Sequence, residues 1–243
     1  MSATGRSDVR LKDDFYQTPA WCIQALWPRL AAFDSCLDPC AGEGAVLHEL
    51  HELSSLASHP TYYGIEINES HARACANKGY GCAVGDALYA RNMWRTPFFQ
   101  KPYELICTNP PYSLALEFVK KALASGAKEV AMLMRLNFLG GGKRAQFWRE
   151  NPCDVLVLPK RPSFAIFMSC KKNQLRSVAG CGWHASYPPT ETILPKGCPS
   201  CGNPTLTKST SDATEYAWFL WRSIADGRGG CQRAQGHWDI LRP

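Results

Sequence analysis

The chain has 243 residues and twelve cysteines, and its 27 lysines and arginines against 21 aspartates and glutamates give a formal net charge of +6. This length suits one domain of moderate size with an insertion, and the cysteine content is below that of a small disulfide scaffold. No run of about 18 uninterrupted apolar residues is present, which excludes a membrane-spanning class and makes a soluble, cytoplasmic protein with mostly reduced cysteines the expectation.

Short apolar runs alternate with longer amphipathic stretches from about Phe33 to Leu158, which is typical of βα units around a mostly parallel sheet. We predict six strands here, at Ser35–Asp38, Tyr62–Ile67, Gly81–Val84, Glu104–Thr108, Glu129–Met134 and Asp154–Leu158. The predicted helices are Ala45–Leu56, Glu69–Lys78, Leu114–Ser125 and Lys143–Glu150. An aromatic strand at Thr214–Trp221 is expected to pair antiparallel with Asp154–Leu158, giving an α/β fold with a seven-stranded, mostly parallel sheet and one antiparallel edge strand.

The character of the chain changes between its last two predicted strands. Residues 165–210 carry glycine, proline, serine, lysine and clustered cysteine without a sustained apolar period. So long a structureless loop is improbable in a compact domain, so something other than a hydrophobic core is expected to order this segment. We predict a core formed by residues 1–164 and 211–225, an insertion at 165–210 and a C-terminal tail at 226–243.

A loop of small residues joins the first predicted strand to its helix, with the sequence Leu37-Asp38-Pro39-Cys40-Ala41-Gly42-Glu43-Gly44-Ala45. Gly42 and Gly44 allow the backbone to approach a ligand closely. The loop stands at the carboxyl end of a strand, where open α/β sheets bind cofactors. It therefore favours a nucleotide-like ligand.

Two further carboxylates follow the next two predicted strands. Glu66 ends the second strand, where it can accept hydrogen bonds from both ribose hydroxyls of an adenosyl group. Asp86 follows the third strand and can accept from the adenine amino group. Together with Asp38, they place an acid after three consecutive strands, which indicates a binding site rather than three solvated strand ends.

The sequence Thr108-Asn109-Pro110-Pro111-Tyr112 directly follows the fourth predicted strand. The prolines fix the backbone and remove two donors, while Asn109 adds an acceptor and Tyr112 a flat face. We expect Asn109 and the Pro110 carbonyl to bind the hydrogens of an exocyclic amine and aim its lone pair at a methyl group, with Tyr112 stacking on the base. Such a reaction is mainly proximity catalysis and needs no strong general base.

These two motifs resemble those of the class I S-adenosylmethionine-dependent methyltransferases, specifically the amino-group DNA methyltransferases that modify adenine. The resemblance implies a Rossmann-like fold and covers roughly residues 13–164 and 211–222. It extends to Asp14-Phe15-Tyr16-Gln17-Thr18-Pro19, which is similar to the motif that closes over the methionyl end of the cofactor. The cofactor residues that it implies are Tyr16, Thr18, Pro19, Asp38, Pro39, Ala41, Gly42, Gly44, Glu66, Ile67, Asp86, Ala87 and Asn109.

The motif order is similar to the gamma arrangement, and two later segments, Arg161-Pro162-Ser163-Phe164 and Asp212–Trp218, look like those of small phage and prophage adenine methyltransferases. Phe164 would help sandwich a flipped adenine and Arg161 would hold a phosphate; the alternative is a core phenylalanine and a surface arginine. Lys143 and Arg144, after three glycines, are further candidates for phosphate contact, or simply a solvated helix start.

The insertion contains two pairs of metal-ligating residues, Cys181 with His184 and Cys198 with Cys201. Thiolates with an imidazole at this spacing suit tetrahedral Zn²⁺, and Cys198-Pro-Ser-Cys201-Gly202 is typical of a zinc knuckle. Cys170 is the alternative to His184 as fourth ligand. A structural zinc would explain how the insertion is ordered without a hydrophobic core.

We therefore expect a monomeric or weakly dimeric methyltransferase, bacterial or phage-encoded, that transfers a methyl group from S-adenosylmethionine to the N6 amine of a flipped adenine in DNA. The basic residues of the insertion would contact nucleic-acid backbone, although a structural clamp over the sheet edge is an equally plain role. RNA adenine or a protein glutamine amide is the alternative acceptor. A non-catalytic nucleic-acid-binding protein on the same fold is the alternative from another class.

Overall fold

The structure is a computed structural model that describes residues 17–54, 60–97, 100–164, 166–170, 184–187, 195–196, 198–202, 206–209, 214–225, 231–233 and 238–241. The chain divides into two compact units. The core unit comprises Thr18–Arg161 and Ala213–Pro243, and the insertion unit comprises Met1–Gln17 and Pro162–Asp212. Among the described residues, no helix has the length and apolar character needed to span a bilayer.

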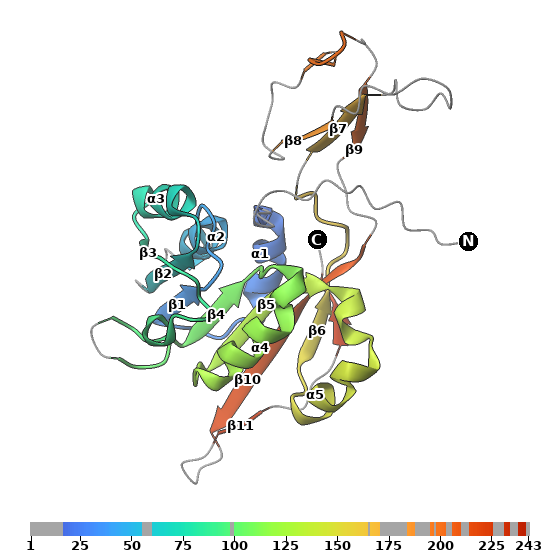
Figure 1. The fold of residues 1–243 in the computed structure, drawn as a ribbon. Coiled ribbons are helices and arrows are strands. Elements are labelled where there is room, and N and C mark those ends of the chain that lie inside the picture. The colour runs from blue at the N-terminus through green and yellow to red at the C-terminus, as the bar shows by residue number, and fades with distance from the viewer. Residues whose placement is uncertain are drawn as a thin grey trace. The chain divides into compact units, whose positions relative to one another are not determined.

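The core unit is built on a sheet whose strands run in the order β12-β6-β10-β5-β4-β1-β2-β3, with β11 paired to β10 (Figure 1). The strands are β1 (Ser35–Asp38), β2 (Thr61–Glu66), β3 (Gly81–Val84), β4 (Leu105–Thr108), β5 (Glu129–Arg135), β6 (Asp154–Val157), β10 (Tyr216–Ala225), β11 (Cys231–Arg233) and β12 (Trp238–Ile240). Strands β3, β2, β1, β4 and β5 are parallel neighbours. The predicted α/β, Rossmann-like fold with a mostly parallel sheet and an antiparallel strand is confirmed.

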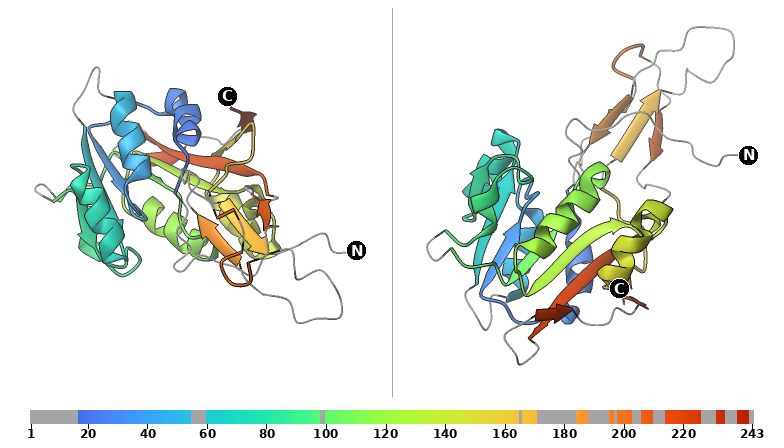
Figure 2. Two further views of the ribbon diagram at one scale, coloured as in Figure 1. Left: turned by 90° about the horizontal axis from the view of Figure 1, so that it is seen from above. Right: turned by 60° about the horizontal axis from the view of Figure 1, so that its bottom comes forward.

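Helices lie on both faces of this sheet, and Figure 2 shows α1 and α2 on one face and α4 and α5 on the other. Their bounds are α1 (Ala20–Leu26), α2 (Ala45–Ser54), α3 (Glu69–Asn77), α4 (Ala115–Ala124) and α5 (Ala145–Glu150). The α3 helix begins after Asn68, whose side chain accepts hydrogen bonds from the amides of Ser70 and His71 and so caps the first turn. Sequence reasoning missed α1, a short helix without a side-chain cap.

The prediction that the antiparallel strand lies at the edge of the sheet is wrong. The predicted pairing of β10 with β6 is confirmed, but β10 also pairs antiparallel with β5 and therefore lies inside the sheet rather than at its edge. β10 lies inside the sheet because the residues of its continuous apolar run, Tyr216–Trp221, are all buried, so that its side chains pack into the hydrophobic core on both faces of the sheet. The edge is taken by β12, which pairs parallel with β6. Residues 226–243, predicted as a tail, thus contribute two short strands to the sheet.

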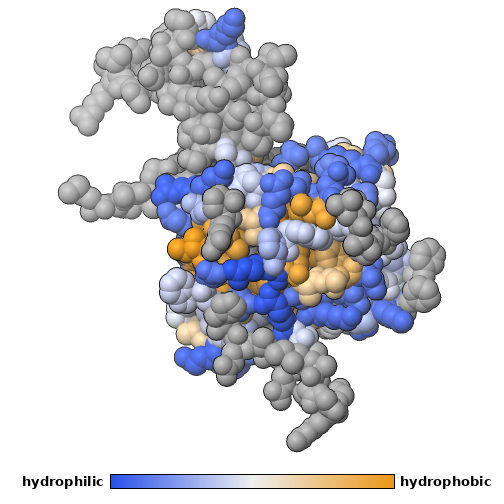
Figure 3. All heavy atoms as spheres, turned by 180° about the vertical axis from the view of Figure 1, so that it is seen from behind, coloured by the Kyte–Doolittle hydropathy of each residue, from blue (hydrophilic) through white to orange (hydrophobic). Residues whose placement is uncertain are grey.

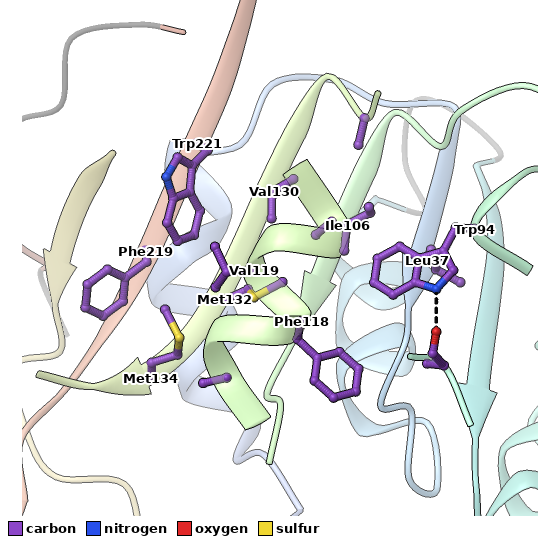
Figure 4. Close-up of a cluster of buried hydrophobic side chains, with 14 of the residues drawn as sticks. Leu37, Trp94, Ile106, Phe118, Val119, Val130, Met132, Met134, Phe219 and Trp221 are labelled. Carbon is purple, nitrogen blue, oxygen red and sulfur yellow. Dashed lines mark hydrogen bonds between the residues drawn. The ribbon is translucent and has the colours of Figure 1, made fainter. Parts of the chain in front are cut away.

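The hydrophobic core under α4 and α5 joins both halves of the sheet. Side chains from β1, β4, β5 and β10 meet Phe118 and Val119 of α4, as Figure 4 shows. Trp148 of α5 stacks on Trp221 of β10, with ring centroids 6.3 Å apart and planes 2° from parallel. Trp94 is also buried, and its indole N–H donates to the carbonyl of Ala87 at 2.8 Å. Burying each such large side chain contributes roughly 1.5–3 kcal/mol, so this core holds the loops at the strand ends in place.

The α1 helix packs on the opposite face of the sheet. The indole N–H of Trp218 donates to the carbonyl of Cys22 at 2.8 Å, which ties β10 to this helix. Ile23 and Leu26 are fully buried beside Cys22. Seen from behind, the surface shows hydrophobic side chains gathered between strongly hydrophilic ones (Figure 3).

The insertion unit contains a three-stranded antiparallel sheet in the order β8-β7-β9. Its strands are β7 (Ile166–Cys170), β8 (His184–Tyr187) and β9 (Leu206–Ser209). The central strand β7 pairs with β8 from Ile166 opposite Tyr187 and with β9 from Phe167 opposite Ser209. Backbone pairing between distant segments thus gives order to a region whose sequence shows no apolar period.

Candidate active site

Asp38 ends β1 and is 1 % exposed. Its Oδ1 accepts hydrogen bonds from the amide of Cys40 at 3.0 Å and from the hydroxyl of Thr108 at 2.6 Å. Burial raises the pKa of Asp38 to about 7; the two donors act to lower this pKa, and the nearby Glu66 carboxylate adds to its rise. The structure therefore buries a carboxyl group at the centre of the site. Ionising this group in the folded protein is unfavourable, and a bound cation would reduce that free-energy penalty.

Glu66 ends β2 and organises the loop that follows β1. One carboxylate oxygen accepts from the amide of Gly42 at 2.8 Å, and the other accepts from the amide of Asn68 at 2.8 Å. Each carboxylate oxygen can accept more than one hydrogen bond. Glu66 therefore combines a loop-holding role with the predicted capacity to accept from a ligand.

The loop after β1 depends on glycine at two positions. Gly42 and Gly44 have φ of +52° and +80°, in the region that side chains other than glycine rarely adopt. A Cβ on Gly44 would stand 2.8 Å from the sulfur of Cys75 on α3. Within β2, a Cβ on Gly64 would stand 2.6 Å from the Cβ of Ala41. The loop therefore lies too close to β2 and α3 to leave room for a side chain at Gly44 or Gly64.

The segment after β3 carries Asp86, whose Oδ1 accepts from the amide of Leu88 at 2.8 Å. This bond forms an Asx turn that fixes the direction of the chain at the strand end. Ala87 is buried, whereas Ile67, which follows β2, is 61 % exposed. An exposed isoleucine at the carboxyl edge of a sheet is suited to cover a flat apolar ligand.

Asn109 follows β4, and its two amide atoms have different partners. Its Nδ2 donates to the hydroxyl of the buried Thr18 at 3.1 Å, and its Oδ1 accepts from the hydroxyl of Tyr112 at 3.2 Å. Pro110 is buried, and the Pro111 carbonyl accepts from the amide of Leu114, which begins a short turn before α4. The loop is therefore held from both ends, with the amide oxygen oriented away from Thr18.

A hydrogen bond joins the segment that begins at Asp38 to the segment Thr108–Tyr112. Because β4 is the parallel neighbour of β1, their carboxyl ends lie side by side. The hydroxyl of Thr108, directly before Asn109, donates to Asp38. The structure thus brings Asp38, Glu66 and the Asn109 loop to one edge of the sheet, with Thr18 beside them; Tyr16 lies outside the described residues.

Sequence reasoning missed the surroundings of Tyr112. The guanidinium carbon of Arg135, at the end of β5, stands 4.8 Å from the centroid of the Tyr112 ring. The Tyr216 ring lies 5.7 Å away, tilted by 53°. Tyr216 falls in the Asp212–Trp218 segment that resembles phage enzymes, whereas no motif marks Arg135.

The predicted phosphate-binding residues have protein partners. Arg161 donates to Glu215 from its Nε at 3.1 Å and its Nη2 at 2.5 Å. Arg144 donates from its Nε to the carbonyl of Phe138 at 2.8 Å, and its guanidinium covers the ring of that residue. The side chain of Lys143 is not described. Phe164 belongs to the insertion unit and is buried.

The predicted zinc ligands are only partly described. Cys181 lies outside the described residues, and the side chain of His184 is not among them. Cys198 is 3 % exposed and Cys201 is exposed. The carbonyl of Cys198 accepts from the amide of Gly202, whose φ is +69°, so these residues form a tight turn. Within the described part of the chain, no three histidine, cysteine or acidic side chains form a group that could hold a metal ion.

A cavity of about 390 Å³ lies elsewhere, against β1, β2 and β3. Its walls include Leu37, Tyr63, Ile65, Met93 and Tyr103, and of its described lining residues none belongs to the predicted site. In the described part of the connection from β3 to β4, the chain forms a short 3₁₀ turn, Arg91–Trp94, next to this cavity. The candidate site is therefore distinct from this apolar cavity.

Comparison with known proteins identifies the fold. No protein-family model matches the chain, and no curated protein sequence matches it. A solved structure from Vibrio vulnificus, provisionally described as a modification subunit of a type I restriction enzyme, matches with a TM-score of 0.53 and 13 % identity, over 88 % of this chain and 48 % of that one. A provisionally described class I S-adenosylmethionine-dependent methyltransferase from Listeria monocytogenes matches with a TM-score of 0.50 and 10 % identity, over 91 % of this chain and 62 % of that one.

A third solved structure, from Pyrococcus horikoshii and provisionally described as an RNA methyltransferase, matches with a TM-score of 0.50 and 12 % identity, over 86 % of this chain and 88 % of that one. The chain thus spans less than two thirds of the Vibrio and Listeria proteins but most of the Pyrococcus protein. These likenesses show that the core unit has the Rossmann-like class I methyltransferase fold.

Proposed function

We propose that this protein is an S-adenosylmethionine-dependent methyltransferase that transfers a methyl group to the exocyclic N6 amine of adenine in DNA. The observation that carries the proposal is the hydrogen bond from Thr108 to Asp38, because it joins the predicted cofactor loop to the predicted amine-binding loop. Two motifs that are far apart in sequence are thereby joined at the carboxyl edge of a sheet, where open α/β folds bind their ligands.

The residues present suit the cofactor. Asp38 is a buried carboxyl group whose pKa is raised to about 7, so a ligand that brings positive charge is favoured beside it. Glu66 offers carboxylate oxygens for ribose hydroxyls, and the positive φ of Gly42 and Gly44 allows close approach of the backbone. Bound S-adenosylmethionine would supply an electrophilic methyl group on a sulfonium centre.

The chain's own residues would orient the acceptor. The Asn109 amide oxygen and the Pro110 carbonyl accept the two hydrogens of the amine, which localises its lone pair on nitrogen and directs that lone pair into the site. Tyr112 provides a flat surface for the base. Because Tyr112 already donates to Asn109 Oδ1 at 3.2 Å, the incoming amine either replaces or shares that hydrogen bond. As the new N–C bond forms, the bond from the methyl carbon to the sulfonium sulfur would break and leave a neutral thioether. The methylated amine would then release one proton to solvent, so no residue needs to act as a strong base, since proximity and orientation supply most of the rate.

DNA is the proposed acceptor because of the resemblance of the Asn109–Tyr112 motif and the net charge of +6, which suits a polyanion. The likeness in fold to the Vibrio modification subunit agrees with this choice. RNA is the second candidate, because the Pyrococcus structure, provisionally described as an RNA methyltransferase, matches this chain over a similar share of both proteins.

We further propose that residues 165–210 form a zinc-bound insertion within a methyltransferase core of residues 1–164 and 211–225. The tight turn from Cys198 to Gly202 supports this proposal, since it brings together the backbone of two cysteines whose spacing is that of a zinc-ligand pair. Cys181 and His184 would complete the four ligands. The metal would supply folding free energy to the insertion.

The test of the main proposal is transfer of radioactive methyl from labelled S-adenosylmethionine to unmethylated genomic DNA, to total RNA and to protein extract in parallel. We expect label in DNA, recovered as N6-methyladenine after digestion to nucleosides. Label in RNA alone would favour the second candidate. Label in none of the three would refute both enzyme proposals and leave the binding-protein alternative.

A further inference from the structure

Arg135 lies at the carboxyl end of β5, next to the loop that begins after β4. In the ladder between β5 and β10 it stands opposite Tyr216. The amide of the following residue, Leu136, donates to the carbonyl of Glu215 at 2.9 Å, so the backbone at this strand end is anchored. A long cationic side chain is thereby fixed at the edge where the candidate site lies.

Among the described residues, two contacts orient the Arg135 guanidinium. Its Cζ is 4.8 Å from the centroid of the Tyr112 ring, within the range of a cation–π interaction. Its Nε donates to the hydroxyl of Tyr216 at 3.2 Å. Tyr216 is 1 % exposed, so its ring is an immobile support. The guanidinium lies near the Tyr112 ring while its Nε donates to Tyr216, a combination of two contacts that the compact ammonium group of a lysine does not reproduce.

Tyr112 in turn fixes the amide that the proposed reaction needs. Its hydroxyl donates to Asn109 Oδ1, while Asn109 Nδ2 donates to Thr18. A continuous series of contacts therefore runs from the end of β5 through Tyr112 and Asn109 to the segment before α1. Each member restricts the rotation of the next, and Arg135 is the end member on the side of β5.

We propose that Arg135 is a positioning residue for methyl transfer: its guanidinium sets the tilt of the Tyr112 ring and thereby orients both the stacking surface and the Asn109 acceptor. This inference rests on the proposed function and deepens it. Arg135 acts through Tyr112 and touches neither the target amine nor the cofactor. Its replacement should therefore impair use of the nucleic acid and leave cofactor affinity unchanged.

The experiment compares two variants. Arg135→Met keeps a long side chain but removes the positive charge and the planar guanidinium, whereas Arg135→Lys keeps the positive charge and removes the guanidinium. With unmethylated genomic DNA as substrate, we expect Arg135→Met to lower kcat/KM about 10- to 100-fold, and Arg135→Lys to recover only part of this loss. The Kd for S-adenosylmethionine, measured by calorimetry, should stay within about twofold of the wild-type value because the cofactor residues are untouched. The matched control is Arg149→Met on α5, an exposed arginine that should behave as wild type.

A double-mutant cycle distinguishes positioning from general structural support. If Arg135 acts through Tyr112, then in a Tyr112→Ala background Arg135→Met should change kcat/KM by less than about threefold. An equal loss in both backgrounds would overturn the proposal, as would wild-type turnover by Arg135→Met.

A readout without catalysis separates this inference from the proposed function. In protein labelled with 3-fluorotyrosine, the Tyr112 resonance, assigned by its absence in Tyr112→Phe, should shift in Arg135→Met and stay in place in Arg149→Met. An unshifted resonance refutes the orienting contact. If the resonance shifts in Arg135→Met but the wild-type protein methylates no DNA, RNA or protein, the proposed function is refuted and, with it, the catalytic purpose of the contact.

Discussion

Asn109 is the residue on which the proposed chemistry depends most directly. Its Nδ2 is engaged by the buried Thr18, so its Oδ1 is presented as an acceptor on the side of Tyr112. We expect Asn109→Ala to reduce methyl transfer by roughly 100-fold or more, because an aligned acceptor is lost while the rest of the site remains. Calorimetry should show nearly unchanged affinity for S-adenosylmethionine, and near-normal turnover by this variant would contradict the role of Asn109.

Asp38 leads to a prediction about pH. Its pKa of about 7 in the folded protein is above that of an aspartate in the unfolded chain, so between these two values the folded state binds more protons. The stability contribution of Asp38 therefore falls as pH rises toward 7 and is constant above it. Asp38→Asn keeps the Oδ1 acceptor for Cys40 and Thr108 and removes the charge.

Relative to Asp38→Asn, we expect the ligand-free wild type to lose roughly 2–3 kcal/mol of unfolding free energy between pH 5 and pH 8. Urea denaturation of both proteins across this range measures the difference. Saturating S-adenosylmethionine should reduce it, since a cation beside Asp38 lowers the pKa of the carboxyl group. Parallel pH profiles for the two proteins would show that Asp38 is already ionised in the folded state at pH 5.

The sequence was enough to predict which residues belong to the candidate site, but not which of their side chains contact one another. Asp38, Glu66 and Asp86 could be predicted because each stands at or just after the end of a predicted strand, and parallel strands present their carboxyl ends at one edge of the sheet. The contact of Arg135 with Tyr112, by contrast, needs the end of β5 beside the loop after β4, and no local pattern encodes that distance. Contacts between side chains on different strands depend on how the whole sheet packs, and this is not visible in any one segment of the sequence.

At the scale of elements, β2 and the loop after β1 are fitted to each other at Gly64. A Cβ there would stand 2.6 Å from Ala41 Cβ and 3.1 Å from the sulfur of Cys82, and the Ala41 amide is held by the carbonyl of Ile65 at 3.0 Å. The loop cannot retreat without breaking that bond. We expect Gly64→Ala to destabilise the protein by about 1–3 kcal/mol and to weaken binding of S-adenosylmethionine.

Chemical denaturation and calorimetry measure the two effects of Gly64→Ala. Gly142→Ala is the matched control, because a Cβ at Gly142 has no atom within 4 Å, so this variant should change neither quantity. Full stability together with wild-type affinity in Gly64→Ala would mean that the loop moves aside freely.

The strand β10 illustrates where element prediction succeeds and fails. Its existence, its direction and its pairing with β6 followed from its aromatic composition and its place in the chain. Its position inside the sheet follows from the unbroken apolar run and not from its aromatic composition. Side chains from Tyr216 to Trp221 are all buried, and such a run is typical of a strand covered on both faces. The three-residue strand β12 offered no comparable signal.

For the whole molecule, the predicted metal is the property most readily tested. We expect about one zinc per chain by elemental analysis of protein purified without chelators, since four ligands at knuckle spacing define one tetrahedral site. Cys198→Ser and Cys181→Ser should each lose the metal, whereas Cys153→Ser, in the core unit, should keep it. Chelation should increase proteolysis within residues 165–210, because the metal supplies folding free energy there. Metal-free wild-type protein would refute the zinc site.

The inner position of β10 has a consequence for how the molecule is made. During synthesis, β5 emerges before β6, and both precede β10, which must later enter between them. The five parallel strands from β3 to β5 can assemble early, but until Tyr216–Ala225 leaves the ribosome, β5 presents an unpaired edge to other nascent chains. The growing chain is therefore most prone to aggregation while residues between β6 and β10 are being translated, and completion of the sheet awaits its latest long strand.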